Sequence, residues 1–78
     1  MQIYYFNIYN DDVTQDFEGK SLADYEAARA YAVVAARALA AETVANGHLG
    51  LSHRIEIQDE SREVVGEVTF ADAVDIRR

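Results

Sequence analysis

Two histidines are the first candidates for chemistry, because imidazole binds metals and exchanges protons near neutral pH. His48 and His53 are separated by a short loop-like stretch, and Ser52 directly precedes His53. A serine and a histidine that are neighbours in sequence rarely reach the geometry of a nucleophile and its base. A metal site with Asp59 as third ligand would depend on a loop spacing that fixes no geometry. We therefore expect no catalytic residue and no metal site.

The acidic stretch over residues 10–18 invites comparison with a calcium-binding loop. An EF-hand loop needs glycine at its sixth position and a bidentate glutamate at its twelfth. Counted from Asn10, these positions hold Gln15 and Ser21. The sequence also contains no GxGxxG, P-loop or HExxH pattern. We interpret the stretch as a turn with solvated carboxylates, and expect a non-enzymatic protein without a cofactor.

Aromatic side chains near the N-terminus form a third candidate site. Alternation along a strand at residues 3–9 places Tyr5, Asn7 and Tyr9 on the face opposite to the core. Such a face resembles the stacking platforms of RNA-binding sheets, but the formal charge of −7 and the scattered basic residues exclude phosphate binding. A small molecule or metal would instead use an alternative ligand patch, made of Tyr5, Tyr9, His48 and His53.

Length and composition define the class of protein. The 78 residues, half of them apolar, are enough for one domain spanning 1–78 with a modest core. The N-terminus lacks the basic segment of a signal peptide, and no apolar run approaches the length of a membrane span. We therefore expect a cytoplasmic protein that binds neither membranes nor nucleic acids.

Hydrophobic periodicity predicts an α+β fold. It would contain a three- to four-stranded, mostly antiparallel sheet with one long helix packed on one face. The helix is expected at 24–46, with a left-handed stop at Gly47. Its N-terminus would be capped either by Ser21, with Asp24 as its capping-box partner, or by Asp24 itself. Residues 59–62 are expected to turn, and Val64, Val68 and Phe70 to point into the core. The other expected elements are strands at 3–9, 53–58 and 63–70, an undecided short strand at 13–17, a turn at 10–12, and a C-terminal helical turn at 71–76.

The expected helix is apolar on two faces. One row, which would face the sheet, contains Tyr25, Ala28, Ala32, Ala35 and Leu39. A second row, here called the outer row, contains Ala27, Tyr31, Val34, Ala38, Ala41 and Ala45. A small sheet covers only one of these rows, so the outer row predicts an interface with a second copy of the chain or with a different protein. The alternative explanation is the high helix propensity of alanine, although this does not account for Tyr31 or Val34.

Five short segments carry a family resemblance, at residues 4–6, 16–19, 22–29, 54–60 and 68–73. Their order and spacing resemble a family of short, uncharacterised proteobacterial proteins with a domain of unknown function. The resemblance implies a small single-domain α+β protein and no particular activity. Family members often carry charged residues where this chain has Ala30, Tyr31, Val34 and Ala38, and Asp or His where it has Asn7.

The helix pattern and the candidate ligand residues support two predictions of function, of which the first is favoured. The favoured prediction is a protein-interaction module that forms a homodimer through the outer row. The alternative is a small-molecule or metal-binding domain that uses the alternative ligand patch.

Overall fold

The N-terminal strand β1, Gln2–Tyr9, organises the sheet, because three other strands pair with it. The computed structural model describes residues 1–10 and 12–74. All strand pairs are antiparallel, in the order β2-β1-β4-β5, with β3 also paired to β1. The remaining elements are β2 (Val13–Thr14), β3 (Lys20–Leu22), β4 (Arg54–Gln58), β5 (Val64–Thr69), and the helices α1 (Tyr25–Ala45) and α2 (Phe70–Ala73).

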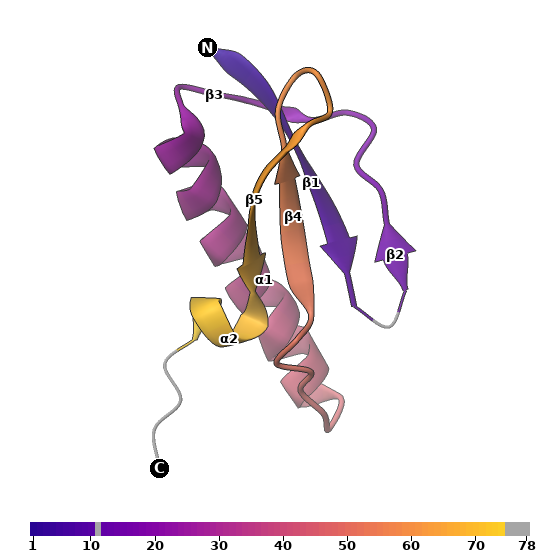
Figure 1. Cartoon of the computed structure of the whole chain (residues 1–78). Coiled ribbons are helices and arrows are strands. Elements are labelled where there is room, and N and C mark those ends of the chain that lie inside the picture. Colours follow the sequence, from indigo (N-terminus) through magenta and orange to yellow (C-terminus); the bar gives the residue numbers. More distant parts are fainter. Residues whose placement is uncertain (11, 75–78) are drawn as a thin grey trace.

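Helix α1 crosses one face of this sheet diagonally, and α2 lies at the end of β5 (Figure 1). The α+β architecture predicted from periodicity is therefore confirmed. Among the described residues, no helix combines the length and apolar character that a membrane span requires.

The ends of α1 follow from local chemistry. The side chain of Asp24 accepts a hydrogen bond from the backbone N–H of Ala27 at 2.9 Å, which caps the first turn. Gly47 follows the helix with a φ of 94°, a conformation that glycine adopts without strain. The prediction of a helix at 24–46 is confirmed to within one residue at each end.

The segment between β1 and α1 differs from its prediction. The undecided strand at 13–17 is reduced to Val13–Thr14, and a further strand appears at Lys20–Leu22. The chain leaves β2 because the Asp16 side chain accepts hydrogen bonds from the N–H groups of Glu18 and Gly19, and Gly19 has a φ of 72°. Before β2, Asn10 accepts a bond from the N–H of Asp12, as expected for a turn; Asp11 lies outside the described residues.

The prediction that Val64 joins the core is wrong. Ile57 of β4 pairs with Gly66, but the next residue, Gln58, pairs with Val64, so Val65 is an extra residue in β5. A bulge of this kind shifts the strand by one residue. The side chains on one side of it therefore point to the opposite face of the sheet from the face that simple alternation predicts. Val64 is therefore 59% exposed, whereas Val68 is fully buried as predicted.

The C-terminal helical turn is shorter and begins earlier than the predicted 71–76. Thr69 and Asp72 form a reciprocal capping box at the start of α2, in which each side chain accepts the other residue's backbone N–H. Phe70 and Ala73 of this turn are buried. The part of the prediction at 75–76 lies outside the described residues.

Alanine lets α1 approach the sheet closely. Ala28, Ala32, Ala36 and Ala40 are at most 3% exposed, whereas the predicted core residues Ala35 and Leu39 are only half-buried. The buried face of α1 thus includes the predicted residues Ala28 and Ala32, but it continues through Ala36 and Ala40 instead of Ala35 and Leu39. The largest fully buried side chains are Phe70, Ile55, Ile57 and Val68.

A larger side chain at Ala36 should therefore separate the helix from the sheet. We expect Ala36→Leu to lower the free energy of unfolding by about 1–3 kcal/mol, because extra methylene groups in a packed core force side chains and backbone apart. Ala30→Leu on the exposed side should change it by less than about 0.5 kcal/mol. Urea unfolding followed by circular dichroism compares the two, and equal effects would contradict the close packing.

Candidate functional site

The outer row of α1 is the most apolar exposed surface among the predicted sites. Val34 is 64% exposed and Tyr31 is 41% exposed, while Ala38, Ala41 and Ala45 are also exposed. Ala27, at the N-terminal end of the row, is half-buried. The row lies on the side of α1 that faces away from the core residues Ala32 and Ala36, so the sheet does not cover it.

Tyr31 differs from the rest of the row because its ring leans toward the sheet. The ring centroids of Tyr31 and Phe6 are 4.7 Å apart, with the ring planes tilted by 56°. The ammonium group of Lys20 lies 5.2 Å from the centroid of the Tyr31 ring, within the range of a cation–π contact. Tyr31 therefore joins the outer row to the neighbouring surface of β1 and β3.

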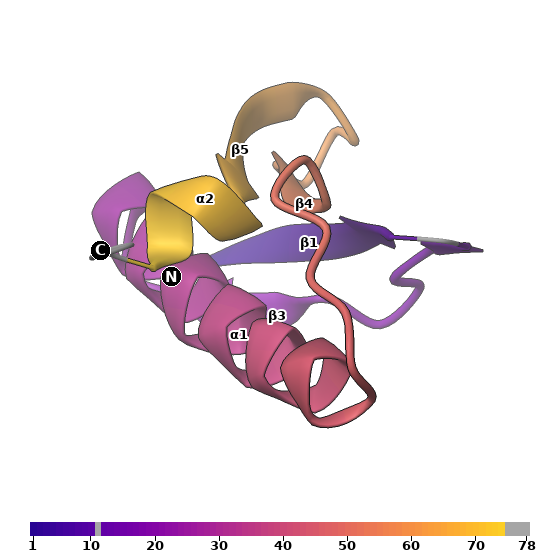
Figure 2. The ribbon, with the colours of Figure 1, turned by 90° about the horizontal axis from the view of Figure 1, so that it is seen from below.

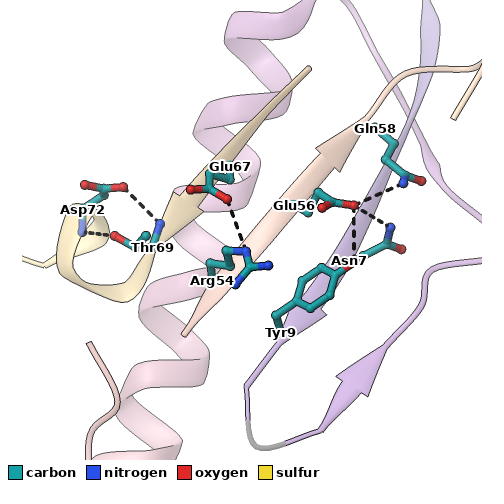
Figure 3. Close-up of polar contacts among 8 residues, drawn as sticks. All are labelled: Asn7, Tyr9, Arg54, Glu56, Gln58, Glu67, Thr69 and Asp72. Atoms are coloured by element: carbon teal, nitrogen blue, oxygen red, sulfur yellow. Dashed lines mark hydrogen bonds and ion pairs between the residues drawn. The ribbon is translucent and has the colours of Figure 1, made fainter. Parts of the chain in front are cut away.

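The open face of the sheet, opposite to α1, carries a polar network centred on Glu56 (Figure 3). Glu56 lies on the central strand β4, and its Oε1 atom accepts a hydrogen bond from Nε2 of Gln58 at 3.2 Å. The Nδ2 group of Asn7 and the hydroxyl of Tyr9 donate to the same oxygen, each at 3.5 Å. Nearby, Arg54 forms an ion pair with Glu67 at 3.2 Å. Glu56 thus collects donors from β1 and from its own strand, while the Oε1 atom of Gln58 is buried without a hydrogen-bond partner.

The two tyrosines of the alternative ligand patch are covered by arginines from the same chain. The guanidinium carbon of Arg62 lies 3.4 Å from the centroid of Tyr5, and that of Arg54 lies 4.4 Å from the centroid of Tyr9. One face of each ring is therefore already occupied. This cation–π packing explains why Tyr5 and Tyr9 are only partly exposed on an open sheet face.

The histidines of that patch lie elsewhere. His53 packs edge-on against the buried ring of Phe70, with centroids 5.5 Å apart, and its ring lies directly against Gly50. His48 is exposed in the loop after α1, where its backbone N–H donates to the carbonyl of Thr43. Tyr5 pairs with Gln58, at the opposite end of β4 from His53. The structure therefore does not bring the four residues into one site. The described residues also contain no group of three or more His, Cys, Asp or Glu side chains that could hold a metal ion.

The sequence interpretation missed the structural role of the Asp16 side chain. Its Oδ2 atom accepts the N–H of Phe6 at 3.1 Å, and its Oδ1 atom accepts the N–H groups of Glu18 and Gly19. Its backbone carbonyl accepts a bond from Nη1 of Arg62 at 2.8 Å. The expectation of solvated carboxylates is therefore wrong for Asp16. An Asp placed three residues before a glycine is a local signal for such a turn.

The buried side chain of Asn7 completes this junction. Asn7 is 3% exposed, and its Oδ1 atom accepts the N–H of Asp16 at 2.9 Å while Nδ2 points to Glu56. The side-chain amide of Asn7 thus links the segment after β2 to the polar network on the open face. The chemistry of Asp16 and Asn7 is structural, because their bonds fix the path of the chain between β2 and β3.

The pKa of Asp16 reflects these contacts. Partial burial raises it, but the N–H groups of Gly19, Phe6 and Glu18, together with the charge of Arg62, outweigh burial and lower the pKa below 3.8. The bonded carboxylate is thus charged at neutral pH and holds three backbone donors.

Comparison with known proteins identifies a family but no activity. The model of a domain of unknown function (DUF6894) matches residues 3–71, so the chain belongs to that family. The resemblance drawn from the five short segments is supported at this level. No curated protein and no solved structure matches the chain.

The lowered pKa of Asp16 predicts a loss of stability in acid. Its contribution to stability is complete above the ordinary pKa of 3.8 and is lost as pH falls through the lower folded-state pKa. We expect Asp16→Asn to be less stable than the unmodified protein at pH 7, and this difference to shrink steadily below about pH 4. Urea unfolding at several pH values measures it, and a difference that is independent of pH would contradict the assignment.

Proposed function

We propose that this DUF6894 protein is a non-enzymatic, cytoplasmic interaction module that self-associates through the outer row of α1. The observation that supports the proposal is the exposure of Tyr31 and Val34 within a continuous apolar row along the helix. Neither residue is required for helix propensity. Val34 lies on the side of α1 away from the fully buried core alanines, and Tyr31 stays 41% exposed although its ring also contacts Phe6. Burial of such a row against a second helix would remove it from water.

The spacing of the row matches helix–helix packing. Successive members are four, three, four, three and four residues apart, which is the heptad pattern of a coiled-coil contact. Small residues dominate the row, and small side chains let two helix backbones approach closely. The row extends over most of α1, which at 21 residues is about 32 Å long.

The sizes of the side chains favour an antiparallel pair. When two copies of α1 cross head to tail about a two-fold axis near residue 36, Val34 of each copy faces Ala38 of the other. The same axis places Tyr31 opposite Ala41, and Ala27 opposite Ala45. Each larger side chain thus meets an alanine, which gives the size complementarity that packed interfaces require. A parallel pair would place Tyr31 against Tyr31 and leave the alanines facing each other.

The proposed dimer is weak. Stable interfaces bury about 1,200–2,000 Å² in total, and one helix that presents mostly alanine contributes less than this. Two chains that each carry a charge of −7 also repel each other, and salt reduces that repulsion. We therefore expect association in the micromolar range or weaker, with a dissociation constant that falls as salt is added.

A charge in the centre of the row should disrupt association. We expect Val34→Glu to raise the dissociation constant at least about tenfold, because the carboxylate would have to be desolvated against Ala38 of the other copy. Val64→Glu is the matched control, since Val64 is similarly exposed but lies on β5. Sedimentation equilibrium measures both variants after circular dichroism establishes that they fold. Equal effects at the two positions would exclude the outer row as the interface.

Introduced cysteines test the antiparallel orientation. The chain has no cysteine, so Val34→Cys and Ala38→Cys each add a single thiol. Oxidation of an equal mixture of the two variants should give mainly the mixed disulfide dimer, because residue 34 of one copy faces residue 38 of the other. Mass spectrometry of the products distinguishes the species. A parallel pair would give mainly the two symmetric dimers, and a statistical mixture would show no preferred orientation; either result contradicts the antiparallel arrangement.

A further inference from the structure

A hollow of about 460 Å³ lies between α1 and the segment that follows β2. Strand β2 projects to the side, beyond the part of the sheet that α1 covers (Figure 2). The hollow on this side is lined in part by the core residues Phe6 and Ile55. We call this hollow the aromatic groove. Its apolar lining consists of Phe6, Ile8, Phe17, Tyr31, Ala35 and Ile55. The volume is within the range of small-molecule sites, about 300–1,000 Å³.

The walls of the groove are aromatic rings that solvent reaches. Phe17 is 75% exposed and Tyr31 is 41% exposed, and Phe6 forms part of the floor beside Tyr31. An exposed phenylalanine next to an apolar hollow leaves apolar surface in water, which a bound apolar group would remove. The geometry therefore favours a ligand with a compact apolar or aromatic body.

The charges around the groove favour a cationic head group. The Tyr31 ring already receives an ammonium group, because Nζ of Lys20 lies 5.2 Å from its centroid. Asp16 and Glu18 also line the groove. The Asp16 carboxylate is already bonded to three backbone N–H groups and lies near the charge of Arg62, so Glu18 is the carboxylate available to a bound ammonium group. The net charge of −7 on the whole chain adds to this preference for a cation over an anion.

We propose that the aromatic groove binds a small organic amine. The apolar body of the amine lies between Phe17 and Tyr31, and its ammonium takes the place of the Lys20 ammonium over the Tyr31 ring, near the carboxylate of Glu18. Lys20 is exposed and flexible enough to move into solvent, so it acts as an internal competitor for this position. The groove shares Tyr31 with the outer row, whereas Phe17 and Lys20 lie outside it, so binding to the groove is tested on the monomer and separately from self-association.

Three probes that share one ring system and differ in charge test this proposal. Naphthylmethylamine, naphthylmethanol and naphthoate are titrated into the ¹⁵N-labelled protein by NMR, at a concentration where light scattering gives the monomer mass. We expect the amine to bind about two- to fivefold more tightly than the alcohol, as a partly exposed cation–π contact provides, and naphthoate to bind most weakly. Amide shifts should centre on residues 14–20 and on the turn of α1 around Tyr31. Naphthoate binding as tightly as the amine, or shifts away from the groove, would overturn the proposal.

Two variants test the assigned roles of the side chains. Phe17→Ser should weaken binding of the amine, and Lys20→Met should strengthen it by removal of the competing ammonium. Val13→Ser is the matched control, because Val13 is 65% exposed on the neighbouring strand but does not line the groove. If Phe17→Ser binds the amine like the control, the groove is not the site. If Lys20→Met binds it no more tightly than the unmodified protein, the ammonium does not occupy the position of Lys20, and the proposal fails.

Discussion

The close contact between the alanines of α1 and the sheet is the constraint on which the rest of the structure depends. Ala28, Ala32, Ala36 and Ala40 bring the helix near the sheet, so only a thin layer of larger side chains separates the two. A single thin helix layer has two consequences. The outer row of α1 stays in solvent, and the β1–β2 side of the sheet is only partly covered, which leaves the aromatic groove open.

Local chemistry explains which parts of the fold could be predicted from sequence. The limits of α1 depend on neighbours in the chain, namely the cap at Asp24 and the glycine at position 47. Strand β4 alternates cleanly in sequence, and its buried residues Ile55 and Ile57 follow that alternation. The strand at Lys20–Leu22 and the extra residue Val65 could not be predicted in this way. The strand depends on pairing with β1, which is distant in sequence. The extra residue depends on the register between β4 and β5, which the pattern within β5 does not reveal, and it reversed the expected position of Val64.

The candidate sites also differ in whether neighbouring residues in sequence could predict them. The outer row is a helical pattern, so its exposure could be anticipated once α1 was placed. The junction around Asp16 could not, because its partners Phe6 and Arg62 come from β1 and from the turn before β5. The aromatic groove likewise depends on the folded chain, because Phe17 and Tyr31, from different segments, line the same hollow. Residue type suggested ligand roles for His48 and His53, whereas folding packs His53 against Phe70 and places Tyr5 at the opposite end of β4.

The central claim is that the second apolar face of α1 is used for self-association. The most direct test is the absolute mass of the unmodified protein, measured by light scattering after size exclusion over a wide range of concentrations. The account predicts a mass that rises from 8.7 kDa toward twice that value as concentration increases. A mass that stays at 8.7 kDa at every concentration would contradict it, and would leave the outer row as a consequence of alanine's helix propensity or as a surface for a different protein.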